Sequence, residues 1–480
     1  MRQSKFTEAD TEAFYNHEDS LYRSFWDREG SLHWGYFDAL ASPSSEDFIQ
    51  ACQRWNEYML EQSGITADSC VLDVGCGNGN TAVWLARQTG CEVVGVDLSS
   101  VRIGNAKALA RQYSSLRLSF HKASATSLPF ADGLFTHVWS QATLYHIHER
   151  ELALREIQRV LKERGIFLFD DLVTPVEEIT EAARHYVYNR LLFEPTFSLE
   201  SYGKKLTQLG LMVLQVKDLS EDLNKSYELL SELAKERYPD LSVAYEKMCE
   251  AIASRDLGWC FYLCEKVSDR MSWIYEPSNT QRLRDKYNAW ASIYDTELDK
   301  PYRCCPIQAA RALEKVQPTK NIRILDAGAG TGMVGEALVE LGYNNVTAID
   351  LSEAMLEVAS KKQVYTALHQ WNLEDTKLFC EEETFDAILA VGVFTFAHAD
   401  PTALRNLNRL LKTGGFFVLT VRVDYNNTCQ SLQEVLKELA WSLISSQELN
   451  IFETEPMYVM VFKKHFLVAG KEDESKVISS

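Results

Sequence analysis

Two short segments of the chain combine aspartate and glycine at a spacing that suits a nucleotide-like ligand. Residues 71–79 read VLDVGCGNG, and residues 324–332 read ILDAGAGTG. A glycine-rich turn between a strand and a helix lets backbone N–H groups approach a ligand closely. An acidic side chain at the end of the next strand can accept hydrogen bonds from both hydroxyls of a ribose. The two segments therefore predict two ligand sites in one chain.

The two segments belong to a longer repeat. Each is followed by a helical stretch, over 81–89 and 333–341, and by a strand that ends in an aspartate, Asp97 or Asp350. The first and second aspartates are 97 − 73 = 24 residues apart in one copy and 350 − 326 = 24 in the other. Two later pairs of segments also align, 135–141 with 385–391 and 159–169 with 409–419. The repeat thus covers a whole domain.

The order of the predicted elements indicates the fold class. Strands that alternate with helices form βαβ units and a parallel, doubly wound sheet, whose ligand lies at the carboxyl ends of the strands. We expect two α/β domains of this Rossmann-like kind in tandem, the first with a helical insertion. The expected division is a first domain over 1–270, with its core at about 50–175 and its insertion and last strands over 176–268, a linker over 271–284 around the turn-like 277–280, a second domain over 285–468, and a disordered tail over 469–480.

The composition narrows the class of partner. The 480 residues include 68 acidic and 49 basic side chains, a formal charge of −19 that repels nucleic acid and anionic lipid. A small-molecule substrate is therefore expected. With no apolar h-region at the start and no long apolar run, the sequence predicts a cytoplasmic protein. The 11 cysteines form no C-x-x-C pair, so neither a disulfide framework nor a metal site is expected.

The glycine spacing separates two kinds of nucleotide-like cofactor. Dinucleotide-binding folds use G-x-G-x-x-G, and the positions of its last glycine hold Asn80 and Met333 here. The pattern D-x-G-x-G-x-G followed by a strand-terminal aspartate instead resembles motifs I and II of the class I S-adenosylmethionine-dependent methyltransferases. This resemblance implies a seven-stranded sheet in each repeat, with S-adenosylmethionine as cofactor and S-adenosylhomocysteine as its product.

The same resemblance assigns roles to the cofactor-site residues. The motif I turn and its aspartate would hold the methionine part, Asp97 and Asp350 the ribose, and the end of the third strand the adenine. That third-strand position is often an aspartate in the family, whereas this chain has neutral residues there. The expected cofactor-site residues are Asp73, Gly75, Gly77, Gly79, Asp97, Leu98, Ser124, Ala125 and Gln141 in the first repeat, and Asp326, Gly328, Gly330, Gly332, Asp350, Leu351, Asn372 and Leu373 in the second.

The first repeat resembles sarcosine and dimethylglycine N-methyltransferases and tocopherol-type methyltransferases. The resemblance lies in residues 32–38 (LHWGYFD), 128–132 (LPFAD) and 139–146 (WSQATLYH). Methyl transfer needs positioning and desolvation of a neutral nucleophile, and aromatic faces suit an amine substrate. Candidates for such an aromatic wall are Tyr22, Phe25, Trp26, Trp34, Tyr36, Trp139 and Tyr145, although core or lid packing is the more expected role for any single one of them. Candidates for the catalytic groups are Gln141, His146 and Tyr36.

The second repeat resembles a different branch, the Williams-Beuren-region methyltransferase-like proteins. Residues 287–295 and 420–422 carry this likeness. His398 is a catalytic candidate there, and Arg422 is a candidate contact for a substrate carboxylate or phosphate. Val391 stands where the first repeat has Gln141. The two substrate pockets are therefore expected to differ.

These observations favour a bifunctional enzyme that methylates a small molecule in successive steps, with the first domain acting on an amine nitrogen. Two alternatives stay open. The second domain can be a regulatory or dimerising module without catalysis, and the acceptor can be an oxygen, carbon or sulfur atom or a protein.

Overall fold

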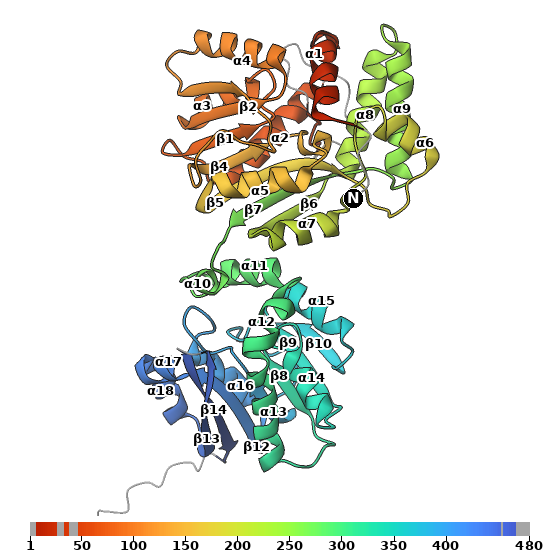
Figure 1. Cartoon of the computed structure of the whole chain (residues 1–480). Coiled ribbons are helices and arrows are strands. Elements are labelled where there is room, and N and C mark those ends of the chain that lie inside the picture. The colour runs from red at the N-terminus through yellow and green to blue at the C-terminus, as the bar shows by residue number, and fades with distance from the viewer. Residues whose placement is uncertain (1–5, 26–32, 38–46, 453–454, 467–480) are drawn as a thin grey trace, which may run out of the picture. The chain divides into compact units, whose positions relative to one another are not determined.

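The computed structural model describes residues 6–25, 33–37, 47–452 and 455–466 (Figure 1). The chain divides into two compact units, Met1–Ser268 and Asp269–Ser480. Trp26 and the tail 469–480 lie outside the described residues, as do the side chains of Tyr22 and Phe25.

The first unit contains a seven-stranded sheet with the strand order β3-β2-β1-β4-β5-β7-β6. Strand β7 runs antiparallel to both of its neighbours, and the other pairings are parallel. Strand β1 is central, and its Asp73 lies between Gly95 of β2 and Trp139 of β4. The strands are β1 (Cys70–Val74), β2 (Glu92–Asp97), β3 (Leu118–Lys122), β4 (Phe135–Ser140), β5 (Leu161–Val173), β6 (Leu211–Asp218) and β7 (Gly258–Lys266).

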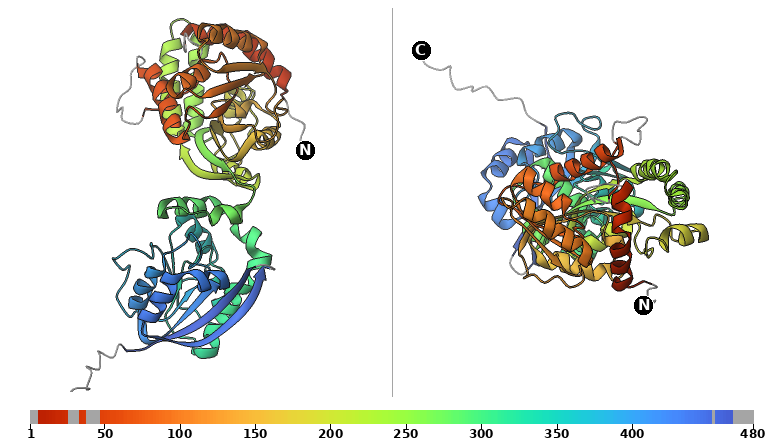
Figure 2. Two further views of the ribbon diagram at one scale, coloured as in Figure 1. Left: turned by 90° about the vertical axis from the view of Figure 1, so that its left-hand side faces the viewer. Right: turned by 90° about the horizontal axis from the view of Figure 1, so that it is seen from above.

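Helices surround this sheet, as Figures 1 and 2 show. The expected helical insertion is present: two helices, α8 and α9, pack against each other between β6 and β7. The helical segments are α1 (Glu8–Phe25), α2 (Asp47–Ser63), α3 (Asn80–Thr89), α4 (Ser100–Gln112), η1 (Leu144–His146), α5 (Arg150–Val160), α6 (Glu181–Ala183), η2 (Arg184–Tyr188), α7 (Leu199–Gln208), α8 (Ser220–Ala234) and α9 (Pro239–Ala253).

The second unit repeats the sheet, with the order β10-β9-β8-β11-β12-β14-β13. Its strand β14 is antiparallel to β12 and β13, and these last two strands form a hairpin where the first unit inserts α8 and α9. The predicted fold class, two Rossmann-like seven-stranded domains in tandem, is confirmed. The strands are β8 (Ile324–Ala327), β9 (Val346–Asp350), β10 (Ala367–Gln370), β11 (Phe385–Ala390), β12 (Leu411–Arg422), β13 (Trp441–Phe452) and β14 (Glu455–Lys464).

The segment 271–284, expected to be a linker, contains most of one helix and the start of another. Its Asn279 side chain caps α11 by accepting from Arg282 N–H over 2.8 Å, because a helix start needs such an acceptor. The helical segments are α10 (Arg270–Ile274), α11 (Thr280–Trp290), α12 (Tyr294–Tyr302), α13 (Cys304–Val316), α14 (Met333–Glu340), α15 (Glu353–Lys361), η3 (Pro401–Ala403), α16 (Leu404–Leu410), α17 (Val423–Thr428) and α18 (Gln430–Glu438).

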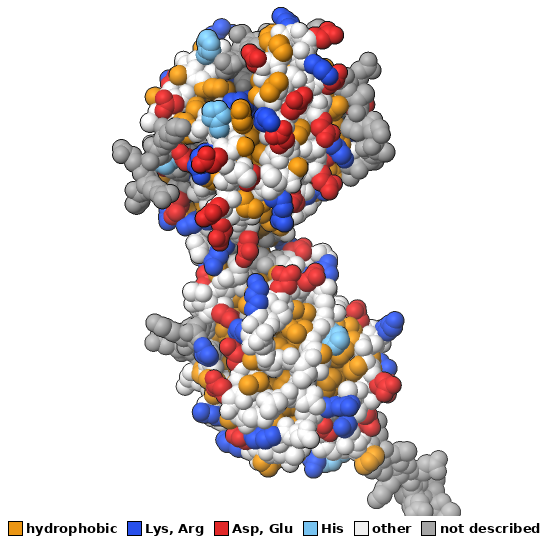
Figure 3. All heavy atoms as spheres, turned by 90° about the vertical axis from the view of Figure 1, so that its right-hand side faces the viewer, with side chains coloured by type: hydrophobic (Ala, Val, Ile, Leu, Met, Phe, Trp, Pro, Cys, Tyr) orange, Lys and Arg blue, Asp and Glu red, His pale blue; other side chains and the backbone are white. Residues whose placement is uncertain are grey.

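The surface carries charges of both signs. Figure 3 shows acidic and basic side chains interspersed over one face of the molecule. Within the described ranges, no helix has the length and apolar character needed to cross a membrane.

Candidate functional site

The first glycine of each motif makes a tight turn directly after its strand. Gly75 and Gly328 have φ values of +77° and +75°, a left-handed conformation that glycine adopts without strain. Their N–H groups donate to the carbonyl oxygens of Val96 and Ile349, each over 2.8 Å. A Cβ on Gly75 would lie 2.1 Å from Thr143 Oγ1. Glycine is therefore needed at this turn for both conformation and space.

The aspartates at the ends of β2 and β9 are held in the same way. Asp97 accepts from the N–H groups of Gly77 at 3.0 Å and Ser99 at 2.8 Å. Asp350 accepts from the N–H groups of Gly330 and Ser352, both at 2.8 Å. Each carboxylate thus joins the glycine turn to the start of the next helix, in the position expected for a group that binds the cofactor's ribose.

The motif aspartates are buried and incompletely bonded. Asp73 is 3% exposed and Asp326 is 0% exposed. Among the described residues, Asp73 Oδ2 and Asp326 Oδ1 have no hydrogen-bond partner. Burial, together with the nearby charge of Asp97 or Asp350, raises the pKa of both carboxyls to about 7. A cationic donor would satisfy each oxygen, so these residues fit the ammonium group of a cofactor's methionine part.

A helix in each unit closes over this region through a tyrosine and an asparagine. On α1, the Tyr15 hydroxyl bonds to His146 Nε2, and Asn16 Oδ1 accepts from Ser99 Oγ over 2.6 Å. On α11, Tyr287 bonds to His398 Nε2 over 2.5 Å, and Asn288 Oδ1 accepts from Ser352 Oγ over 2.6 Å. The sequence analysis missed both tyrosines and both asparagines. A Tyr-Asn dipeptide seven residues before another tyrosine occurs at 15–22 and again at 287–294, and this repeat is the signal that marks them.

We call α1 and α11 the lid helices. The orientation of the second lid's hydrogen bond follows from its histidine. His398 Nδ1 lies 2.7 Å from the Phe396 carbonyl oxygen, which can only accept, so Nδ1 donates and Nε2 accepts from Tyr287. Burial lowers the pKa of His398, and it lowers the pKa of His146 to about 3. Both imidazoles are therefore neutral at pH 7, and His146 is a poor proton acceptor in this arrangement.

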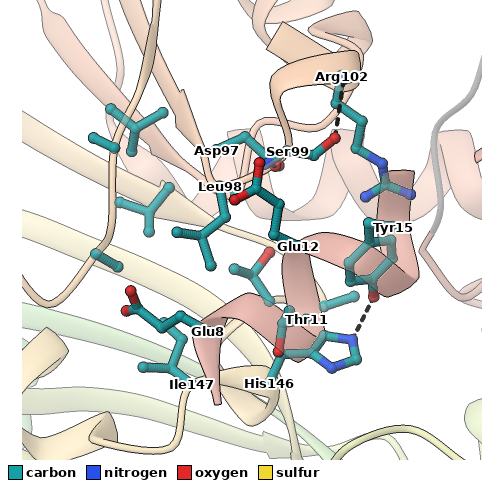
Figure 4. Close-up of a pocket in the computed structure, with 17 residues that line it drawn as sticks. Glu8, Thr11, Glu12, Tyr15, Asp97, Leu98, Ser99, Arg102, His146 and Ile147 are labelled. Carbon is teal, nitrogen blue, oxygen red and sulfur yellow. Dashed lines mark hydrogen bonds between the residues drawn. The ribbon is translucent and has the colours of Figure 1, made fainter. Parts of the chain in front are cut away.

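The first unit has two small cavities at this site, of about 70 and 60 Å³. Tyr15 and Arg102 line both of them, with the guanidinium carbon 4.0 Å above the ring centroid. Figure 4 shows Tyr15 reaching from α1 toward His146 with Arg102 beside it. Ligand pockets usually measure about 300–1,000 Å³. The space beside α1 is therefore smaller than a typical small-molecule pocket.

The second unit has one larger cavity of about 420 Å³ at the same place. In its α15, Met355 occupies the position of Arg102 and is buried, with its N–H donated to Ser352 Oγ. Among the described residues that line the cavity, none is Lys or Arg. Three are acidic, Asp350, Glu374 and Asp400, and its aromatic wall consists of Tyr287, Tyr294, Tyr302 and Trp371.

Several predicted residues line these cavities. Gln141 lies in the smaller first-unit cavity, where its amide accepts from Trp139 Nε1 at 3.0 Å and donates to Asn56 Oδ1 at 2.9 Å. His146 lines the other cavity. Lining residues from the predicted set are Asp73, Gly75, Gly77, Asp97, Leu98 and Ala125 in the first unit and Gly328, Gly330, Asp350, Leu351, Asn372, Leu373 and His398 in the second.

The predicted substrate-binding aromatic residues lie elsewhere. Trp34, Tyr36 and Tyr145 are 2%, 8% and 5% exposed, and none lines the two described cavities of the first unit. They pack into an aromatic cluster with α2 and β7, because burial of large rings stabilises the core. Tyr36 therefore does not take the expected catalytic position here. Arg422 forms a two-bond ion pair with Asp424, at 3.0 and 2.7 Å, and does not line the second cavity.

Two of the expected cofactor-site glycines stand at the start of a helix. Gly79 and Gly332 precede α3 and α14 with φ values of +84° and +95°. A Cβ on Gly79 would lie 2.9 Å from the Phe120 ring. These glycines let the helix after the turn pack closely.

Comparisons with known proteins agree with this site. Residues 72–169 and 325–419 each match the family model described as a methyltransferase domain. The chain is 30% identical over 212 residues to methyltransferase GfsG of Streptomyces halstedii, covering 43% of this chain and 74% of that protein. It is 30% identical over 232 residues to the glycine/sarcosine/dimethylglycine N-methyltransferase of Actinopolyspora halophila, covering 48% and 40%. A geranyl diphosphate C-methyltransferase structure from Streptomyces coelicolor A3(2) aligns at 18% identity with a TM-score of 0.47, covering 54% and 97%.

The chain belongs to the S-adenosylmethionine-dependent methyltransferases, with the methyltransferase domain present twice. The predicted family, enzyme class and cofactor are confirmed. The relatives act on different atoms, since an O-methyltransferase of Aspergillus sclerotiorum, 27% identical over 264 residues, stands beside the N-methyltransferase.

Proposed function

We propose that both units bind S-adenosylmethionine and methylate a small-molecule amine in successive steps. The observation that carries this proposal is the duplicated cofactor site. In each unit a buried motif aspartate keeps one oxygen without a partner among the described residues, and a second aspartate is held by two backbone N–H groups. A copy that had lost cofactor binding would have no need of either arrangement.

The residues of each unit have distinct tasks in this reaction. When bound, S-adenosylmethionine supplies an electrophilic methyl group on a sulfonium. Asp73 or Asp326 holds the ammonium of its methionine part, and Asp97 or Asp350 holds its ribose hydroxyls. The lid tyrosine and its neutral histidine exclude water and fix the lid, and this desolvation favours attack by a neutral nucleophile.

The second cavity supports an amine as the acceptor. Its lining combines tyrosine rings with the acidic Asp400, and the described lining includes no basic side chain. Aromatic faces and carboxylates both stabilise an ammonium ion. Burial raises the pKa of Tyr287, Tyr294 and Tyr302, so their hydroxyls stay neutral donors and acceptors. Two of the relatives are named as N-methyltransferases, which supports the same choice.

The test uses the full chain with methyl-labelled S-adenosylmethionine and a panel of small amines, alcohols, thiols and carboxylic acids. With the partly methylated amines included in the panel, we expect label on an amine, one methylation step lost in Asp73→Ala, the other step lost in Asp326→Ala, and all transfer lost in the double variant. Label on oxygen, sulfur or carbon would replace the amine proposal. Complete loss in Asp73→Ala with full transfer in Asp326→Ala would make the second unit a non-catalytic module.

A further inference from the structure

The end of the third strand differs in the two units from the acidic residue that the family often has there. Ser124 follows β3, and Asn372 occupies the same position after β10. The match is set by the backbone, because Ala123 N–H donates to Asp97 O at 3.1 Å and Trp371 N–H donates to Asp350 O at 3.0 Å. Neither Ser124 nor Asn372 offers a carboxylate to a base.

A carboxylate nevertheless reaches this place in the first unit, from the lid helix. Glu8 Oε1 accepts from Ser124 Oγ at 2.5 Å and from Thr126 Oγ1 at 3.2 Å. Figure 4 shows its carboxylate beside Ile147, and Glu8, Leu98 and Ile147 all line the same cavity. Both of these bonds use Oε1, which leaves Oε2 able to accept another donor.

In the second unit the carboxylate and the threonine stand at exchanged positions. Its lid helix begins with Thr280, seven residues before Tyr287, as Glu8 stands seven residues before Tyr15. Its third-strand loop has Glu374, two residues after Asn372, where the first unit has Thr126. Thr280 and Glu374 both line the second cavity. The pair Glu8 and Thr126 is thus exchanged for Thr280 and Glu374, and each unit keeps one carboxylate and one threonine at this edge.

We infer that Glu8 of the lid helix recognises the adenine amine in the first unit, whereas Glu374 of the sheet-end loop does so in the second. This inference rests on the proposed cofactor binding by both units. An amine that donates to a carboxylate forms a charge-assisted hydrogen bond, which is stronger than a bond to a neutral acceptor. Because Glu8 lies on α1, which also carries the Tyr15–His146 contact, base recognition in the first unit depends on the placement of that lid helix. In the second unit it is independent of the lid.

The test measures base discrimination by calorimetry. S-adenosylhomocysteine is compared with its purine riboside analogue, in which hydrogen replaces the 6-amino group, on the full chain carrying Asp326→Ala so that only the first site titrates. We expect at least about a tenfold preference for the adenine compound, as for other hydrogen bonds to charged groups. Adding Glu8→Gln should reduce the preference to less than about threefold. Glu12→Gln, one turn further along the same lid and paired with Lys122 at 2.5 Å, should leave the ratio unchanged.

Two results would overturn the inference. An unchanged ratio in Glu8→Gln, even with weaker binding of both compounds, would reduce Glu8 to a lid contact. If the Asp326→Ala chain with Glu8 intact bound both compounds equally, there would be no hydrogen bond from the adenine amine to Glu8. If neither compound titrated in the Asp326→Ala chain, cofactor binding by the first unit would itself fail, which is a separate outcome. Glu8 is exposed at the start of α1, so Glu8→Gln should fold normally.

Discussion

The two units build the same cofactor site but leave very different space in it. The first has cavities of about 70 and 60 Å³ where the second has one of about 420 Å³. The glycine turns, the paired aspartates and the Tyr–His contact of the lid are common to both. Among the differences are Arg102 and Gln141 in the first unit, where the second has Met355 and Val391. The repeated scaffold thus sets where the cofactor is expected to bind, whereas the side chains around that place differ between the units.

Alanine at the first motif glycine should have the largest effect. Gly75→Ala and Gly328→Ala place a Cβ 2.1 Å from Thr143 Oγ1 and 2.4 Å from Val393 Cγ2, at a positive φ. Overpacking and a left-handed residue together cost about 2–5 kcal/mol. Denaturant unfolding should show this loss in the unit that carries the change. Gly330→Ala is the matched control, since its Cβ meets nothing within 4 Å and only the smaller conformational cost of about 1–2 kcal/mol remains. Equal effects at both positions would contradict the close approach.

The pH dependence of cofactor binding should be the same in both units. Below about pH 7 the motif carboxyls carry a proton in the free protein, because their pKa is raised to about 7. Binding an ammonium favours the ionised carboxylate, so the proton must leave. The Kd at each site should rise by up to about tenfold for each pH unit below 7 and level off above it. Calorimetry in buffers of different ionisation enthalpy would detect the released protons. If the Kd depended on pH at one site alone, the two motif aspartates would not have the same role.

The lid contact should matter more in the second unit. Tyr287→Phe and Tyr15→Phe each remove one hydroxyl from a neutral imidazole, a contribution of about 0.5–1.5 kcal/mol. In the first unit Arg102 still stacks on the ring at 4.0 Å, whereas the second unit has a methionine there. Hydrogen exchange should therefore speed up more in α11 than in α1. If hydrogen exchange sped up equally in α1 and α11, the Arg102 contact would not be what holds the first lid helix in place.

The smallest effect is expected at the loop after the fourth strand. Ala142 has a φ of +47°, and the second unit has Gly392 at this position with +72°. Their N–H groups donate to Asp170 Oδ1 at 3.0 Å and Thr420 Oγ1 at 2.8 Å. Ala142→Gly should raise the free energy of unfolding by up to about 1 kcal/mol, because a left-handed alanine is strained. A chemical denaturation midpoint that falls would argue against that strain.

The sequence predicted the features that depend on neighbouring residues. The glycine turns, the aspartates of the second strands and the repeated βαβ order are local patterns, and the structure places their residues at one edge of each sheet. It did not predict contacts made across long stretches of chain. Tyr15 and His146 lie 131 positions apart, and Glu8 and Ser124 lie 116 apart. No periodicity marks such pairs before the fold brings them together.

The aromatic residues show the same limit. Trp34, Tyr36 and Tyr145 were interpreted as a possible substrate wall, yet they fill the core beside α2 and β7. An aromatic side chain has the same type whether it packs inside or lines a pocket, so only the tertiary structure separates the two roles. The sequence alone also does not show that Arg102 packs on the ring of Tyr15, or that Met355 takes its position in the second unit.

Calorimetry that counts bound S-adenosylhomocysteine shows whether one chain carries two working cofactor sites. Two molecules per chain are expected, with one lost in Asp73→Ala and the other in Asp326→Ala. A single bound molecule per chain that one of these substitutions abolishes and the other leaves intact would contradict this expectation.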